Sequence, residues 1–323
     1  MKSVLAAAAA LLLALAAPAW AQPYPSVKPI RLICPFPAGG SADNVTRIVA
    51  RGLAEGLGQQ VIVDNRPGGD GIIAANALLQ SAPDGYTLLM GTATGMSAVP
   101  AMRKQSPYDP VNDFSAISHI GDFVHLLLVH NEVPAQSLQE FIAYARANPG
   151  KLNYATTNFT AQAGTLQLMK ATAIDMVHVP YKGSAQSIPD LISGRVQVSF
   201  DSSPAIYMPH VKTGKLRILA TMMGHRSPLA PEAPTLSEVG IQPVQTQPWG
   251  GLFGPAKLPK PLADRLSREV AQLLQQPETR KRLDDQGFEP QASSPEQFGA
   301  FVKTQLETWR RVAKEGGMAL DSP

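Results

Sequence analysis

The chain has 323 residues and a formal net charge of +3. This weak charge, with no Lys/Arg-rich run, argues against a nucleic-acid surface. The length suits two domains, each with its own core. The single cysteine, Cys34, lies inside an apolar run. An internal disulfide is therefore excluded, and we expect Cys34 to be a buried small side chain rather than a reactive thiol.

The N-terminal segment predicts an export signal. Lys2 precedes an uncharged apolar run from Val4 to Ala17, and Pro18 is followed by the small-x-small cleavage pattern Ala19-Trp20-Ala21. The run is shorter than the about 20 apolar residues that a membrane-spanning helix needs. We therefore expect removal of the signal peptide, residues 1–21, and a periplasmic protein that begins at Gln22 and carries no lipid-anchoring cysteine there.

Short apolar runs then alternate with amphipathic segments, the pattern of largely parallel sheets flanked by helices. In the first series we predict strands at Ile30–Phe36, Val61–Asn65 and Tyr86–Thr92, with helices from Asp43 to Gly58 and over Ile72–Gln80. In the second we predict strands at His125–His130, Leu152–Ala155, Met176–Tyr181, Val196–Asp201 and Leu216–Ala220, with helices at Ser137–Asn148, Thr165–Ala173 and Ser187–Ser193.

Beyond Trp249–Pro255 the chain is predicted to be helical to its end. A helical tail without strands needs a sheet to pack on, so we expect it to return to the first lobe. The predicted architecture is a two-lobed α/β fold with lobe 1 formed by residues 22–124 and 246–323 and lobe 2 by residues 125–245. Two hinge crossings, near Gly121–Val124 and Pro243–Trp249, would join the lobes around a ligand cleft.

The most informative motif is the loop Pro35–Asp43, between a predicted buried strand and a helix. Its glycines allow close approach of the backbone to a ligand, and the first turn of a helix presents unpaired N–H groups that attract an anion. In open α/β sheets this position is the usual binding crevice. Asp43 is better interpreted as the helix cap than as an acid catalyst, because it would repel a bound anion.

A second polar cluster, Thr156–Thr160, follows the strand at Leu152–Ala155 and could donate hydrogen bonds from the other lobe, although a plain surface loop fits the residues alone. Thr92 and Thr94 are weaker candidates of the same kind. Asp201 could accept a hydrogen bond from a ligand or fix a hinge loop, and the sequence favours neither. Phe36, Phe159 and Trp249 could form walls of the pocket or belong to the core. Lys182 could place an ammonium group near the cleft, but a lysine at the end of a strand is more commonly exposed to solvent.

Enzyme signals are absent from the sequence. The six histidines form no HExxH or HxH pattern, so we expect neither a metal site nor a cofactor. No G-x-S-x-G motif occurs, and NRPGGDG lacks the lysine and hydroxyl of a phosphate-binding loop.

Several stretches together resemble one family, the Bug-type extracytoplasmic solute receptors, also described as TctC-like binding proteins of tripartite tricarboxylate transporters. The resemblance covers essentially the whole chain after the signal segment, in order. It rests on YPSVKPIRLICPFPAGGSAD, QQVIVDNRPGGDGIIAA, APDGYTLLMGT, SPYDPVNDF, NPGKLNYAT, MVHVPYKGSA, DLISGRVQVSFD, KTGKLRILA, APTLSEVG and EQFGAFVKTQLETW.

This resemblance implies a type II periplasmic-binding-protein fold and a small carboxylate ligand: a di- or tricarboxylate, an acidic amino acid or an aromatic acid. It also implies that two loops hold the ligand's inner carboxylate. Where the family's second loop is commonly Ser/Gly-rich, this chain has Thr-Thr-Asn-Phe-Thr, and Ser202 replaces the family's usual Asn. The implied ligand-binding residues are Phe36, Pro37, Ala38, Gly39, Gly40 and Ser41 on one side, Thr156, Thr157, Asn158 and Thr160 on the other, and Asp201 at the end of its strand.

The leading hypothesis is a monomeric, non-enzymatic binding protein that delivers a carboxylate to membrane subunits of a tripartite transporter. The alternatives are a receptor that presents the ligand to a sensor kinase and, less favoured, a secreted enzyme. The sequence names neither the ligand nor the membrane partner.

Overall fold

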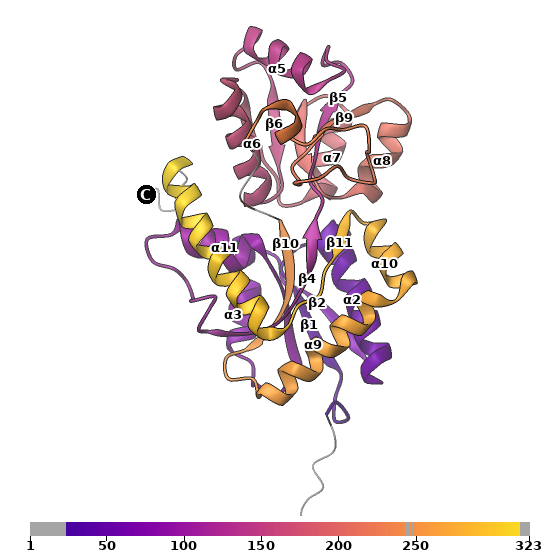
Figure 1. Ribbon diagram of the computed structural model, residues 1–323, viewed down its shortest axis with the longest axis vertical. Coiled ribbons are helices and arrows are strands. Elements are labelled where there is room, and N and C mark those ends of the chain that lie inside the picture. The colour runs from indigo at the N-terminus through magenta and orange to yellow at the C-terminus, as the bar shows by residue number, and fades with distance from the viewer. Residues whose placement is uncertain (1–23, 243–245, 247, 317–323) are drawn as a thin grey trace, which may run out of the picture.

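The protein consists of two α/β lobes stacked along its long axis, as the computed structural model in Figure 1 shows. The structure describes residues 24–242, 246 and 248–316, so the predicted signal peptide, residues 1–21, lies outside the described residues. Each lobe is built on one sheet covered by helices. The predicted two-lobed α/β architecture is confirmed. None of the helices within the described ranges combines the length and the apolar character needed to cross a membrane.

The first lobe contains a six-stranded sheet in the order β11-β4-β10-β3-β1-β2. Its strands are β1 (Ile30–Cys34), β2 (Val61–Asn65), β3 (Thr87–Thr92), β4 (Phe114–Phe123), β10 (Trp249–Pro255) and β11 (Phe288–Pro290). Strands β1, β2 and β3 are parallel, whereas β10 runs antiparallel to both of its neighbours. The helices are α2 (Ser41–Leu57), α3 (Ile72–Leu79), α4 (Val99–Met102), α9 (Lys260–Gln275), α10 (Pro277–Asp284) and α11 (Pro295–Gly316), with short turns η1 (Gly69–Gly71) and η2 (Thr94–Ala98).

Alternation along the strands places a separate core on each face of this sheet. Leu32 packs with residues of α2 and α9, whereas its neighbour Ile33 packs with residues of α3 and α11. Leu88 and Leu89 of β3 divide in the same way. Because successive side chains of a strand point to opposite faces, a continuous apolar run requires helices on both sides.

The second lobe contains a five-stranded sheet in the order β7-β6-β8-β5-β9. Its strands are β5 (Leu126–His130), β6 (Asn153–Thr156), β7 (Val177–Pro180), β8 (Val198–Asp201) and β9 (Leu216–Thr221). Its helices are α5 (Leu138–Ala147), α6 (Phe159–Thr172), α7 (Ser184–Ile192) and α8 (Pro204–Lys212), with the turn η3 (Ser237–Val239). Helices α5 and α6 contribute to the core on one face, and α7 and α8 to the core on the other.

The chain passes between the sheets through segments that lie side by side. Only Val124 and His125 separate β4 from β5. The N–H of Phe123 donates to the carbonyl oxygen of Pro248 at 2.6 Å, and the N–H of Val124 donates to that of Gly287 at 2.8 Å. These bonds tie the outgoing crossing to Pro248, which leads back into β10, and to the turn between α10 and β11 of the first lobe.

Two predicted helices of the second lobe begin earlier in the structure than in the prediction. Helix α6 begins at Phe159, not Thr165, because the side chain of Asn158 caps its first turn by accepting from the N–H of Ala161 at 2.9 Å. Helix α7 begins at Ser184 rather than Ser187, directly after Gly183. Both helices therefore start closer to the preceding strand than the apolar pattern indicated.

The C-terminal part is also not wholly helical, because β11 interrupts it and pairs with β4. Upstream, the glycine-rich segment Trp249–Pro255, which the sequence left unassigned, is a central strand. A Cβ atom at Gly251 would overlap the ring of Phe298, so close packing requires glycine where strand propensity disfavours it.

A small apolar cluster joins the lobes away from the crossings. Trp309 of α11, which is fully buried, packs with Ala98 and Met102 of the first lobe and with Ala163 of α6 in the second. Phe159, at the start of α6, lies against the same cluster. Helix α11 thus runs along the first lobe and contacts α6 of the second lobe (Figure 1).

Candidate ligand-binding site

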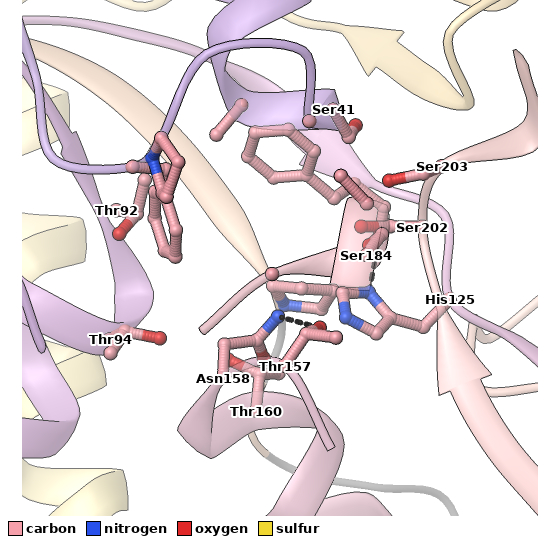
Figure 2. Close-up of a pocket in the computed structure, with 18 of the residues that line it drawn as sticks. Ser41, Thr92, Thr94, His125, Thr157, Asn158, Thr160, Ser184, Ser202 and Ser203 are labelled. Atoms are coloured by element: carbon pink, nitrogen blue, oxygen red, sulfur yellow. Dashed lines mark hydrogen bonds between the residues drawn. The ribbon is translucent and has the colours of Figure 1, made fainter. Parts of the chain in front are cut away.

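A cavity of ≈ 280 Å³ lies between the lobes and is lined by residues from both. Its described lining residues carry hydroxyl, amide and imidazole groups, and none of them is Lys, Arg, Asp or Glu. The first lobe contributes Phe36, Pro37, Ala38, Gly40, Ser41, Ala42, Thr92, Ala93, Thr94, Phe123, Pro248 and Trp249. The second contributes His125, Thr157, Asn158, Thr160, Gly183, Ser184, Ala185, Gln186, Ser202 and Ser203. Figure 2 shows the polar side chains arranged around the space.

The first turn of α2 opens onto this cavity. Gly40 is its N-cap residue, in an extended conformation and without a side-chain cap, and its carbonyl oxygen accepts from the N–H of Asn44 at 3.0 Å. Within the described part of the chain, the N–H groups of Ser41 and Ala42 have no hydrogen-bond partner. They are free to donate to an anion, as N–H groups at a helix N-terminus characteristically do.

Asp43 is the third residue of α2 and lies within this first turn, but the N-cap is Gly40, which corrects the sequence-based interpretation. Its carboxylate accepts from the N–H of Gly39 at 2.9 Å, from Nε of Arg47 at 2.9 Å and from Nδ2 of Asn65 at 2.8 Å. Burial raises the pKa of Asp43, but these hydrogen bonds outweigh it and leave the pKa below its usual value. The negative charge is thus neutralised by Arg47 and tied into the loop, outside the cavity lining.

Helix α6 presents a second N-terminal turn from the other lobe. Asn158 caps it through Oδ1, while its Nδ2 donates to Oγ1 of Thr157 at 3.3 Å. The N–H groups of Phe159 and Thr160 have no partner among the described residues. The sequence-predicted side chains Thr157, Asn158 and Thr160 therefore lie at a turn that can donate to an anion, opposite α2.

Helix α7 presents a third such turn, which the sequence reasoning missed. Its N–H groups at Ser184 and Ala185 are also without a partner in the described part of the chain, whereas those of Gln186 and Ser187 donate to Gly183. The sequence does contain a signal for this turn. The tripeptide Gly-Ser-Ala that opens α2 at Gly40 recurs at Gly183, again shortly after a strand.

The structure brings together most of the sequence-predicted site residues at the cavity: Phe36, Pro37, Ala38, Gly40, Ser41, Thr92, Thr157, Asn158 and Thr160. Gly39, Thr156 and Asp201 are not part of the lining. Gly39 forms the turn before α2 with φ of +87°, and Oγ1 of Thr156 lies 2.6 Å from Nε2 of His178.

Asp201 is fully buried behind the cavity and accepts hydrogen bonds from two turns that line it. Oδ2 accepts from Oγ of Ser184 at 2.7 Å, and Oδ1 accepts from the N–H of Ser203 at 2.7 Å. Burial raises the pKa of Asp201 to about 6. Of the two alternatives left by the sequence, this geometry corresponds to fixing neighbouring loops.

The aromatic candidates divide between wall and core. Phe36 and Trp249 line the cavity, whereas Phe159 packs in the cluster around Trp309. The sequence reasoning missed Phe123, His125, Ser203 and Pro248, which lie at the crossings or at the start of α8. The sequence around these residues contains no motif that indicates a binding site. They reach the cavity only because of the path that the chain takes between the lobes.

The metal-ligating and nucleophilic side chains of this region have the following surroundings. Among the described residues, no group of three or more His, Cys, Asp or Glu side chains could hold a metal ion. Cys34 is fully buried, and burial raises the pKa of its thiol, which disfavours the nucleophilic thiolate. The hydroxyl of Ser184 donates to a carboxylate rather than to a histidine base.

Comparison with known proteins agrees with this geometry. The family model described as the tripartite tricarboxylate transporter family receptor, TctC, matches residues 45–318. The chain belongs to this family. The protein BugT of Bordetella pertussis is 34% identical to this TctC receptor over 315 residues, which cover 95% of this chain and 94% of BugT.

Two solved structures extend the similarity to three dimensions. The Rhodopseudomonas palustris protein Rpa4515, solved with adipate, has a TM-score of 0.85 and 32% identity, covering 92% of this chain and 99% of that one. MatC of the same organism, solved with bound malate, has a TM-score of 0.80 and 29% identity, covering 88% of this chain and 99% of that one.

Proposed function

We propose that this TctC receptor is a periplasmic solute-binding protein that captures a small organic carboxylate between its lobes and delivers it to the membrane subunits of a tripartite transporter. The observation that carries the proposal is the convergence of the N-terminal turns of α2, α6 and α7 on one cavity. Each turn offers unpaired N–H groups and the positive end of a helix dipole.

A carboxylate suits this lining better than a cation does. No described residue of the lining is charged, and the polar donors come from both lobes, so a bound carboxylate would be held by neutral groups on two sides. Hydrogen bonds from neutral donors to a charged acceptor are stronger than those between neutral groups. The relatives solved with adipate and with malate support a small carboxylate as the ligand.

Delivery to a transporter implies that the ligand is bound and released unchanged. The proposed role places the chain in the periplasm after removal of residues 1–21, and it requires neither a cofactor nor a catalytic group. Closure of the lobes around the ligand would bring the turns of α2 and α6 to the same carboxylate.

The test is a thermal-shift screen followed by calorimetric titration of the exported chain with adipate, malate, succinate, citrate, glutamate and benzoate. A ligand at 100 times its Kd stabilises the folded state by about 2.7 kcal/mol, which raises the melting temperature measurably. Recovery of unaltered ligand would exclude turnover. The proposal is wrong if none of these acids, nor a broader carboxylate panel, changes the melting temperature.

A further inference from the structure

His125 lies where the first crossing enters the second lobe. It follows β4 by two residues, and its carbonyl oxygen accepts from the N–H of Met222 at 3.0 Å, which fixes its backbone. The side chain lines the cavity and is only 2% exposed. Figure 2 shows its ring directed into the space between the lobes, on the same side as Ser184 and Ser202.

The neighbouring backbone favours one tautomer of this ring. Nδ1 of His125 lies 3.5 Å from the carbonyl oxygen of Phe123. A carbonyl oxygen only accepts hydrogen bonds, so Nδ1 carries the hydrogen. Burial lowers the pKa of His125 to about 4, and the imidazole is therefore neutral at physiological pH. The remaining nitrogen, Nε2, bears a lone pair and no hydrogen.

This lone pair has no partner in the described part of the protein. Nε2 of His125 is buried and makes no hydrogen bond to any described residue. A second acceptor lies in the same part of the cavity, because the hydroxyl hydrogen of Ser184 is donated to Asp201 and leaves oxygen lone pairs. A buried acceptor without a partner is unfavourable, and a donor group of the ligand would satisfy it directly, whereas a carboxylate could pair with Nε2 only after the imidazole took up a proton.

We infer that Nε2 of His125 accepts a hydrogen bond from the ligand, so that the preferred solute is a carboxylic acid carrying a separate donor, such as a hydroxyl, amide or amine group. This inference rests on the proposed function and deepens it. The N-terminal turns of α2 and α6 hold the carboxylate. His125 then discriminates among carboxylates, because it binds those whose second polar group can donate a hydrogen bond to Nε2. A site built to hydrogen-bond a ligand donor rejects the analogue that lacks it.

The test uses pairs of acids that differ only in a hydroxyl or a methyl group. The pairs are malate and methylsuccinate, 6-hydroxyhexanoate and heptanoate, and 3-hydroxybenzoate and 3-methylbenzoate, each titrated calorimetrically at pH 7.5. In the wild-type protein the hydroxyl acid of at least one pair should bind at least about ten times more tightly than the matching methyl acid. His125→Leu should abolish that preference, and His125→Gln, which keeps an acceptor, should retain part of it.

A second measurement depends on no variant. Nitrogen-15 correlation spectra of histidine-labelled wild-type protein should show His125 protonated at Nδ1 only, with the Nε2 resonance shifted when the hydroxyl acid binds. Binding of both members of every pair within twofold, or a protonated Nε2, would overturn the inference while leaving carboxylate binding intact. Failure of all six acids and of the broader carboxylate panel would overturn the proposed function and this inference together.

Discussion

Replacing Gly40 with valine should remove ligand binding while leaving the protein folded. Gly40 has φ of −85° and ψ of 172°, an extended conformation that a β-branched residue adopts readily. A Cβ atom there would meet only the carbonyl oxygen of Pro37, at 4.0 Å. Valine is a poorer N-cap residue than glycine, so we expect the free energy of unfolding to fall by about 1 kcal/mol or less.

The effect on binding should be far larger, because the new side chain would stand beside the unpaired N–H groups of Ser41 and Ala42. Each hydrogen bond from a neutral donor to a charged group contributes about 1.5–3 kcal/mol. Loss of two such bonds would cost about 3–6 kcal/mol, or roughly two to four orders of magnitude in Kd. Calorimetric titration with the best carboxylate of the screen measures this change, and urea unfolding measures the stability.

The adjacent glycine is a matched control. Gly39 has φ of +87°, does not line the cavity, and has open space at its Cβ position. Gly39→Ala should therefore cost about 1–2 kcal/mol of stability through backbone strain, with affinity reduced much less than in Gly40→Val. Unchanged affinity in a folded Gly40→Val protein would refute the proposal that the first turn of α2 binds the carboxylate.

Three further predictions follow from other parts of the structure. Because the pKa of Asp201 is raised to about 6, the folded state holds this proton more tightly than the unfolded chain, and its contribution to stability falls as pH rises from 4 to 6. At about 1.36 kcal/mol per unit of pKa, the free energy of unfolding of Asp201→Asn should rise by about 2–3 kcal/mol relative to wild type between pH 4 and pH 7. Parallel urea-unfolding profiles for the two proteins would contradict this. Trp309→Ala should weaken carboxylate binding although Trp309 does not line the cavity, since its side chain packs against α6 of the other lobe. Calorimetric titration should show a much smaller loss of affinity for Trp309→Phe, and equal Kd values for the wild type and both variants would argue against coupling between this cluster and the binding site. Ser137 caps α5, remote from the cavity, by accepting from the N–H of Glu140 at 3.2 Å. Ser137→Ala should therefore lower the free energy of unfolding by about 1 kcal/mol and leave the Kd of the ligand unchanged, and a change in Kd would contradict this.

Elements with a strong local pattern could be predicted from the sequence. Strand β2 occupies the predicted Val61–Asn65, and β1 and β3 lie within their predicted ranges. These strands are short apolar runs bounded by turn residues, so the signal lies in the segment itself. The loop before α2 was identified for the same reason, since its glycines and the following amphipathic helix are adjacent in the chain.

Where packing overrides local preference, the sequence was insufficient. Strand β4 was not predicted, and β10 is rich in glycine, which strands disfavour, yet Gly251 is required by the close approach of Phe298. The early starts of α6 and α7 were missed because their opening turns contain polar residues facing the cavity rather than an apolar stripe.

By itself, the sequence determined that this chain forms two α/β units with a glycine-rich turn suited to an anion, because strand runs, helix periodicity and turn residues are local properties. Only the tertiary structure decided which turns meet. It brings the opening turn of α7 to the same cavity as those of α2 and α6 and withdraws Asp201 behind the lining. It also sets His125 at the crossing with a buried nitrogen that has no hydrogen-bond partner among the residues described. The physical reason is that a cavity between lobes is formed by residues far apart in the chain, whose proximity depends on the path of the backbone.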